Sequence, residues 1–159
     1  MKQWNSLLVL LLLIVVCLSV AGFGAIFTSS SVSQWYPTLR KPSWNPPSWI
    51  FGPVWTTLYL MMAIAAWLVW RKLGFRGAAG TLWLFALQLV LNAAWSPLFF
   101  GLKSPLAGLV DIVPLWAAIL ATLISFWKIS PAAGLLFVPY WLWVSFATIL
   151  NFTIWKMNR

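Results

Sequence analysis

The 159-residue sequence contains no histidine, one acidic residue (Asp111) and one cysteine (Cys17). With a single carboxylate and no histidine, the chain cannot assemble a conventional pair of nucleophile and general base. We expect no metal site, because a haem iron would need Cys17, a methionine or a tyrosine as its axial ligand. The lone cysteine gives no information on disulfides, and in an apolar helix such a residue is most often a small buried hydrophobe.

Charge is also scarce. Charged residues make up 7% of the chain and hydrophobic residues 63%, whereas a soluble domain carries about 25% charged residues. So little charge cannot solvate a globular surface, and the composition therefore predicts an integral, multi-pass membrane protein. The net charge of +9 comes from ten cations dispersed between apolar runs. That dispersion is typical of charges flanking membrane helices and not of a basic patch, so we expect no nucleic-acid partner.

Five apolar spans are each long enough for the roughly 20 residues that a bilayer requires. They cover residues 7–27, 48–70, 79–101, 105–127 and 132–155. Most connections are short, so consecutive helices should be antiparallel neighbours. The sequence predicts an all-α fold, a five-transmembrane-helix bundle in one domain (1–159), with a long structured loop between helices 1 and 2.

The first span and the orientation of the bundle each leave a question open. Lys2, a leucine-rich core and the small residues at 19–21 resemble a secretory signal, but the apolar run continues to Phe27, which favours a retained helix. Lys and Arg are divided five against five between the two sides of such a bundle. The positive-inside rule therefore leaves the orientation open, as it does the identity of the membrane.

Fourteen tryptophans are the most prominent feature of the composition. Those at span ends fit interfacial belts: Trp4, Trp70, Trp127 and Trp155. Others recur at helical spacing on three faces: Trp55, Tyr59, Met62 and Ala66; Gln88, Asn92, Trp95 and Phe99; and Trp143, Ala147, Leu150 and Asn151. An unpaired amide in lipid costs several kcal/mol, so the three amides should face the bundle interior. They serve there either as interhelical hydrogen bonds or as part of a ligand site.

The aromatic faces favour the ligand site. Small residues that permit close helix contact occur elsewhere, at Ala21 and Ala25 and at Ala117, Ala121 and Ser125. We therefore expect helices 1 and 4 to serve packing, and helices 2, 3 and 5 to surround a flat apolar molecule.

Three longer motifs occur in order: WYPTLRKPSWNPPSWIFGPVWTTLY at 35–59, NAAWSPLFFG at 92–101 and PYWLWVSFATILN at 139–151. In these motifs the sequence resembles the TspO/MBR family of tryptophan-rich sensory proteins and translocator proteins. The resemblance implies a five-helix bundle, usually homodimeric, that binds porphyrins such as protoporphyrin IX. Many members also bind sterols and synthetic isoquinoline or benzodiazepine-type ligands, and some bacterial members are linked to light-dependent porphyrin breakdown. The ligand-contacting positions that it implies here are Tyr36, Pro46, Trp55, Tyr59, Asn92, Trp95, Trp143, Ala147 and Leu150.

The stretch from Thr28 to Pro47 reads as a stiff loop that covers the bundle mouth, because long loops in compact domains are usually lids or binding loops. Its prolines favour extended geometry in the residues before them. Asn45 is expected to cap helix 2, with Pro46 at its first position. We expect Trp35, Tyr36 and Trp44 to face what lies beneath; the alternative is an interfacial anchor.

Two features carry less weight. An acid inside a span costs about 2.5–3.5 kcal/mol on insertion scales, so Asp111 is a candidate functional residue; we favour a structural pair with Lys103, Arg40 or Lys41. Val32, Tyr36 and Arg40 fit a permissive cholesterol-contact pattern. Near the C-terminus, residues 150–152 read LNF and lack the tyrosine that some relatives carry, so sterol binding stays open.

We therefore expect a membrane-embedded tetrapyrrole-binding protein that acts as a sensor, regulator or sink and needs no cofactor beyond its porphyrin ligand. One alternative is a small transporter of porphyrins or other apolar ligands. A second is porphyrin photodegradation that uses Trp55 and Trp143, so enzymatic activity stays open.

Overall fold

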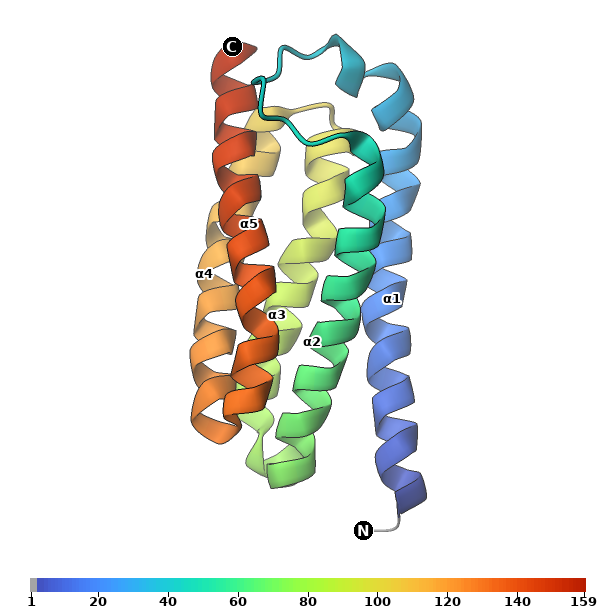
Figure 1. Ribbon diagram of the computed structural model, residues 1–159, viewed down its shortest axis with the longest axis vertical. Coiled ribbons are helices and arrows are strands. Elements are labelled where there is room, and N and C mark those ends of the chain that lie inside the picture. Colours follow the sequence, from blue (N-terminus) through green and yellow to red (C-terminus); the bar gives the residue numbers. More distant parts are fainter. Residues whose placement is uncertain (1–2) are drawn as a thin grey trace.

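The computed structural model describes residues 3–159, with side chains from residue 5 onward, so Lys2 and the Trp4 side chain lie outside the described residues. Within this range, five long helices run side by side (Figure 1). They are α1 (Gln3–Gln34), α2 (Ser48–Gly77), α3 (Ala79–Ser96), α4 (Pro105–Ile129) and α5 (Pro131–Met157). Each is long and apolar enough to cross a bilayer, which confirms the predicted all-α membrane bundle.

Tight connections make neighbouring helices antiparallel. A single residue, Ser130, separates α4 from α5, and both helices begin with proline, whose missing N–H costs nothing in a first turn. A π-helical turn, η2 (Pro97–Gly101), extends α3. Ser104 then caps α4 by accepting a hydrogen bond from the Ala107 N–H at 3.2 Å. Two of the connections and the N-terminal end of α1 therefore lie at one end of the bundle (Figure 1).

Helix α1 is longer than predicted. It continues through the hydroxyl-rich stretch after Phe27 and ends at Gln34. The hydroxyls do not break the helix, because three of them bond its own carbonyls: those of Thr28, Ser29 and Ser33. Thr28 Oγ1, for example, donates to the Gly24 oxygen at 2.9 Å and Ser33 Oγ to the Ser30 oxygen at 3.2 Å. The covering segment is therefore shorter than expected and consists of residues 35–47, with a short 3₁₀ helix, η1 (Tyr36–Thr38). We call residues 35–47 the lid.

Helix α2 also passes through a predicted break. The basic residues after Trp70 remain helical to Gly77, and the chain bends at Gly74, whose φ of 67° suits a residue without a Cβ. Two of the long basic side chains find partners, one on α2 itself and one at the end of α4. Arg71 lies over the Trp67 ring at 4.6 Å, and Lys72 Nζ donates to the Ile129 carbonyl at 2.9 Å.

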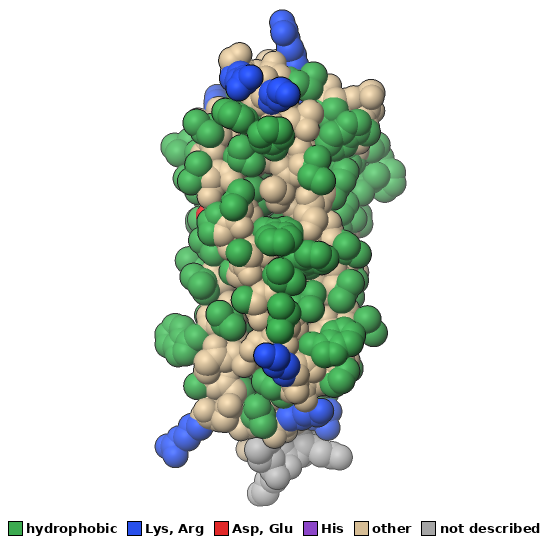
Figure 2. Space-filling view, turned by 90° about the vertical axis from the view of Figure 1, so that its left-hand side faces the viewer, with side chains coloured by type: hydrophobic (Ala, Val, Ile, Leu, Met, Phe, Trp, Pro, Cys, Tyr) green, Lys and Arg blue, Asp and Glu red, His purple; other side chains and the backbone are tan. Residues whose placement is uncertain are grey.

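The surface matches a bilayer. Lys and Arg lie toward the two ends of the molecule, and hydrophobic side chains cover the zone between them (Figure 2). Large apolar residues such as Leu12, Val15 and Ile26 are exposed there, as lipid-facing positions should be. The expectation for Trp70 was wrong: it is 6% exposed and packs against Phe75 instead of joining an interfacial belt.

Two tight helix contacts depend on glycines, and the predicted small-residue stripe on α4 is only partly a packing surface. A Cβ at Gly134 would lie 2.6 Å from the Trp127 ring, and one at Gly108 would lie 2.7 Å from the Phe99 ring. Ala117 is exposed, whereas Ser125 is hydrogen-bonded to Thr81 across α3 and α4 at 3.0 Å. The absence of a side chain at Gly134 and Gly108 therefore determines how closely α5 and η2 approach α4.

Candidate ligand-binding cavity

A cavity of about 560 Å³ lies in the half of the bundle nearest the lid. Every long helix contributes to its wall, together with η1 and η2. The walls are mostly apolar and aromatic. Eight of the nine predicted contact positions lie in the lining: Tyr36, Trp55, Tyr59, Asn92, Trp95, Trp143, Ala147 and Leu150. The ninth, Pro46, does not, and its carbonyl instead accepts a hydrogen bond from Asn45 Nδ2 at 3.1 Å.

Helical spacing explains how these side chains meet. Trp55 and Tyr59 are one turn apart on α2, as are Trp143 and Ala147 on α5, so each pair shares a face. The same faces continue below the cavity. Met62 and Gln88, which belong to the predicted stripes, are fully buried in the floor and do not line the cavity.

Aromatic contacts fix the three indole rings of the wall. Trp95 stacks on Phe99 with ring centroids 4.9 Å apart and an interplanar angle of 19°. Trp55 lies edge-on to Tyr140 at 6.1 Å, and Trp143 lies edge-on to Phe51 at 5.9 Å. Each indole is thus held by a neighbouring ring in one of the arrangements that aromatic pairs favour.

Two walls were missed from sequence. Helices α1 and α4 had been assigned to packing, but both line the cavity, α1 with Ala21, Gly22, Gly24 and Ala25 and α4 with Ile112 and Leu115. A face of small residues can either bring two helices close together or leave an empty space between them. Residue spacing alone does not distinguish these two outcomes. The signal that could have distinguished them is the pairing of this small-residue face with an aromatic face on α2.

The cavity is open on one side, between α1 and α2. Lining residues on both helices are exposed there, and they are Gly22, Ala25 and Ser29 on α1 and Ser48, Gly52 and Thr56 on α2. A Cβ built at Gly22 or Gly52 would meet no atom within 4 Å. Because both helices cross the bilayer, this opening faces lipid near the lid end of the bundle.

A chain of side-chain hydrogen bonds forms the floor. Tyr59 Oη donates to Asn92 Oδ1, and Asn92 Nδ2 donates to Tyr140 Oη at 2.8 Å. Tyr140 Oη then donates to Gln88 Oε1 at 3.0 Å. The amides at 88 and 92 are both buried, as predicted, but they differ in role. Gln88 joins helices below the cavity, whereas Asn92 both joins helices and lines the cavity.

The third amide anchors the opposite wall. Asn151 Nδ2 donates to the Pro105 carbonyl at 2.7 Å, and its Oδ1 accepts from Trp95 Nε1 at 3.3 Å. It is 2% exposed, as an amide in a lipid-embedded helix should be. This one side chain connects α5 to the first residue of α4 and to the indole of α3.

Hydrogen bonds of two side chains brace the lid internally, and those of a third tie it to the end of α5. Tyr36 Oη donates to Asn45 Oδ1 at 2.7 Å, and Lys41 Nζ donates to the carbonyls of Tyr36 and Leu39 at 2.7 and 2.9 Å. Asn158, beyond the end of α5, pairs with both backbone groups of Arg40 at 2.9 Å. Burial raises the pKa of Tyr36, while the hydrogen bond to Asn45 acts in the opposite direction, and the hydroxyl keeps its proton for that bond.

Two expectations for the lid were wrong. Asn45 does not cap α2, which begins at Ser48 after Pro47 without a side-chain cap, because its oxygen is already bonded to Tyr36. Of the three aromatic residues expected to face what lies beneath, Tyr36 lines the cavity and Trp35 packs inward on the lining residue Phe99 at 5.6 Å. Trp44 does not line the cavity and is 46% exposed.

A family model for the TspO/MBR family matches residues 12–156. The chain belongs to the TspO/MBR family. It is 51% identical to the tryptophan-rich protein TspO of Chlorobaculum tepidum over 158 residues, 97% of this chain and 98% of the relative. It is also 42% identical to the human translocator protein over 138 residues (86% and 82%) and 41% identical to protein CrtK of Rhodobacter capsulatus over 146 residues (91% and 89%).

In this TspO/MBR protein the single acid takes no part in the cavity. Asp111 is 7% exposed, and its Oδ2 has no hydrogen-bond partner among residues 3–159. The favoured pairing with Lys103, Arg40 or Lys41 is absent. Lys41 is bound to lid carbonyls instead, and Lys103 lines a separate groove on the outside of the bundle.

The floor of this TspO/MBR cavity yields a stability prediction. Tyr140→Phe removes a hydroxyl that serves two amides, and it leaves Asn92 Nδ2 and Gln88 Oε1 each without that partner. We expect it to lower the free energy of unfolding by about 1–3 kcal/mol in an SDS-titration assay.

The matched control is Tyr59→Phe. It removes the hydrogen-bond donor of Asn92 Oδ1 alone. This oxygen lies beside the cavity, where water can replace the lost donor, so the free energy of unfolding should fall by less than in Tyr140→Phe. Equal losses for the two variants, or none for Tyr140→Phe, would contradict this account of the floor.

Proposed function

We propose that this membrane protein binds a flat, apolar tetrapyrrole of the protoporphyrin IX type in the cavity and acts as a sensor, regulator or sink for it. The observation that carries the proposal is the convergence of Trp55, Trp95 and Trp143, from three helices, on one cavity. Its volume of about 560 Å³ falls within the roughly 300–1,000 Å³ typical of small-molecule sites. The homodimer implied by the family resemblance stays a prediction.

The chemistry of the lining supports a ring held by packing. Indole faces favour stacked or edge-on contact with another aromatic system, which a porphyrin offers over a wide area. The described lining residues include no histidine, cysteine or methionine. The two tyrosine hydroxyls, at 36 and 59, already donate to amides. A metal-free porphyrin, or one bound without protein ligation, therefore suits this lining best.

The side opening gives such a ligand a route from the bilayer. The exposed lining residues there include the hydroxyls of Ser29, Ser48 and Thr56. An amphiphilic porphyrin would place its apolar ring against the indoles and its carboxylates toward these hydroxyls and the interface. This arrangement keeps the carboxylates out of the apolar interior, where charge is costly.

The closed floor supports binding over passage through the bundle. Met62, Gln88 and Tyr140 are fully buried beneath the cavity and close its far end. A transporter would have to open this hydrogen-bonded floor, whereas a sensor or sink needs only the side opening. Substrate flux into proteoliposomes, compared with plain binding, separates the two functions.

A steric substitution tests the site. Ala147 lies one turn beyond Trp143 and lines the cavity, so Ala147→Leu should fill space that the ligand needs. We expect protoporphyrin IX affinity, measured by quenching of tryptophan fluorescence, to fall about tenfold or more, equivalent to about 1.4 kcal/mol.

Ala117→Leu is the matched control, because Ala117 is exposed on α4 outside the cavity. It should leave the affinity unchanged. Equal affinity of the wild type and Ala147→Leu would show that the helix α5 face does not hold the ligand.

Two indoles in the lining also favour a second candidate, light-dependent porphyrin breakdown. Excited porphyrin oxidises indole directly or through singlet oxygen, and Trp55 and Trp143 both line the cavity. We expect illumination of the complex to change the porphyrin spectrum in a way that free porphyrin does not show. Trp55→Phe and Trp143→Phe should retain binding while this photoproduct diminishes. If each variant keeps the full photoproduct yield, the two residues act only as walls.

A further inference from the structure

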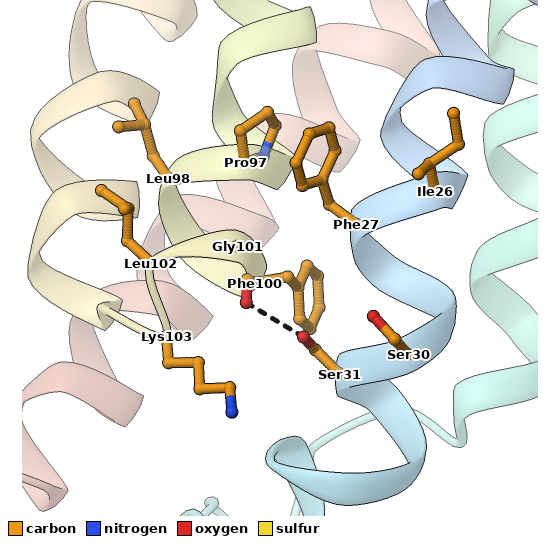
Figure 3. Close-up of a pocket in the computed structure, with 10 residues that line it drawn as sticks. All are labelled: Ile26, Phe27, Ser30, Ser31, Pro97, Leu98, Phe100, Gly101, Leu102 and Lys103. Carbon is orange, nitrogen blue, oxygen red and sulfur yellow. Dashed lines mark hydrogen bonds between the residues drawn. The ribbon is translucent and has the colours of Figure 1, made fainter.

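A second hollow lies on the outside of the bundle, between α1 and η2 (Figure 3). This outer groove has a volume of about 580 Å³ and is lined on one side by α1 residues 26, 27, 30 and 31 and on the other by residues between Pro97 and Lys103. It is separate from the tryptophan cavity, although Phe100 lines both. The proposed tetrapyrrole site leaves the outer groove without a function.

The outer groove is amphipathic along its length. Ile26, Phe27, Pro97 and Leu98 lie together toward one end, and the serines of α1 and Lys103 lie toward the other (Figure 3). Lys103 belongs to the connection between η2 and α4, at the end of the bundle. The apolar end therefore faces the hydrocarbon layer, and the basic end lies at the level of lipid headgroups.

Two donors at the basic end are unused by the protein. The hydroxyls of neighbouring α1 residues all donate to carbonyls, and Ser31 Oγ reaches the Phe100 carbonyl across the groove at 3.0 Å. Ser30 and Lys103 are exposed, and neither Ser30 Oγ nor Lys103 Nζ takes part in the side-chain hydrogen bonds within the described range. By contrast, Lys41, on the same side of the bundle, is engaged by lid carbonyls.

The backbone at Lys103 gives independent support. Its φ of 51° lies in the left-handed region, and it is the one residue other than glycine with a positive φ among residues 3–159. Glycine or asparagine would adopt this conformation at lower cost, so the turn carries a lysine where the backbone alone favours a smaller residue. Lys103 lies across the outer groove from the α1 serines (Figure 3).

We propose that the outer groove binds one anionic phospholipid of the surrounding bilayer, with its phosphate at Lys103 Nζ and Ser30 Oγ and an acyl chain along Ile26, Phe27 and Leu98. Charge complementarity favours this occupant, because a phosphate is the anion that the bilayer supplies at this depth. A second copy of this chain fits less well. Its one acidic side chain, Asp111, is buried and could not pair with Lys103.

The bound lipid would also influence the ligand cavity. It would contact both α1 and η2, which the Ser31–Phe100 hydrogen bond already joins. Phe100 lines both the outer groove and the cavity. A lipid that binds only the folded bundle should therefore stabilise the contact between α1 and η2 beside the cavity.

Native mass spectrometry of the delipidated full-length protein tests this proposal. Protein is titrated with phosphatidylglycerol or with phosphatidylcholine of identical acyl chains. The wild type should bind one phosphatidylglycerol molecule in clear preference to phosphatidylcholine. Lys103→Asn tolerates the left-handed backbone but removes the charge, and it should weaken that first binding step about fivefold.

Three further variants complete the design. Lys103→Arg keeps the charge and should retain the preference. Lys156→Asn removes an exposed cation from the same end of the bundle but outside the groove, and should also retain it. Ser30→Ala alters one hydroxyl on an exposed helix face and should weaken binding even if Lys103→Asn fails to fold.

The outcomes decide the proposal. Equal binding of the two lipids by the wild type would overturn it, as would an unchanged preference in both Lys103→Asn and Ser30→Ala. Loss of the preference in Lys156→Asn to the same degree would mean that the lipid responds to general surface charge. A dimer whose formation excludes the lipid and depends on Lys103 would assign the groove to a second copy of the chain instead.

Discussion

Side-chain amides inside a bilayer must find partners within the protein, and this requirement organises the bundle. An unpaired amide in hydrocarbon costs several kcal/mol. The chain from Tyr59 through Asn92 and Tyr140 to Gln88 meets the requirement by joining α2, α3 and α5 at one level. Because each hydroxyl and amide has a set direction and reach, the three helices have little freedom to slide or rotate. The cavity begins where this chain ends, at the Tyr59–Asn92 pair.

Above that floor, side-chain shape determines the cavity. Rings from α2, α3 and α5 are too wide to interdigitate closely, while glycines and alanines of α1 supply no bulk to fill the remaining space. The lid closes the end of the bundle. Hydrogen bonds of Tyr36 and Lys41 brace it internally, and those between Arg40 and Asn158 tie it to the end of α5. The remaining opening faces lipid. A flat molecule that partitions into membranes can therefore reach the indoles without crossing water.

The helical bundle and the aromatic faces of the cavity on α2, α3 and α5 follow from sequence because both depend on periodicity. Apolar length identifies the helices, and 3.6-residue spacing places Trp55 with Tyr59 and Trp143 with Ala147. Choices between competing partners do not follow from sequence. The hydroxyls of residues 28–33 can end a helix or bond within it, and Asn45 can cap a helix or bond Tyr36; tertiary contacts decide each case. Asp111 found none of its expected cationic partners, because Lys41 and Lys103 are directed elsewhere.

The central claim is that the tryptophan cavity is the tetrapyrrole site of this TspO/MBR protein. The most direct measurement is an experimental structure of the protein crystallised with protoporphyrin IX. The account predicts ring density inside the cavity, in van der Waals contact with Trp55, Trp95 and Trp143, with the floor hydrogen bonds intact. A porphyrin bound only on the outside of the bundle, with the cavity empty of it, would contradict the account.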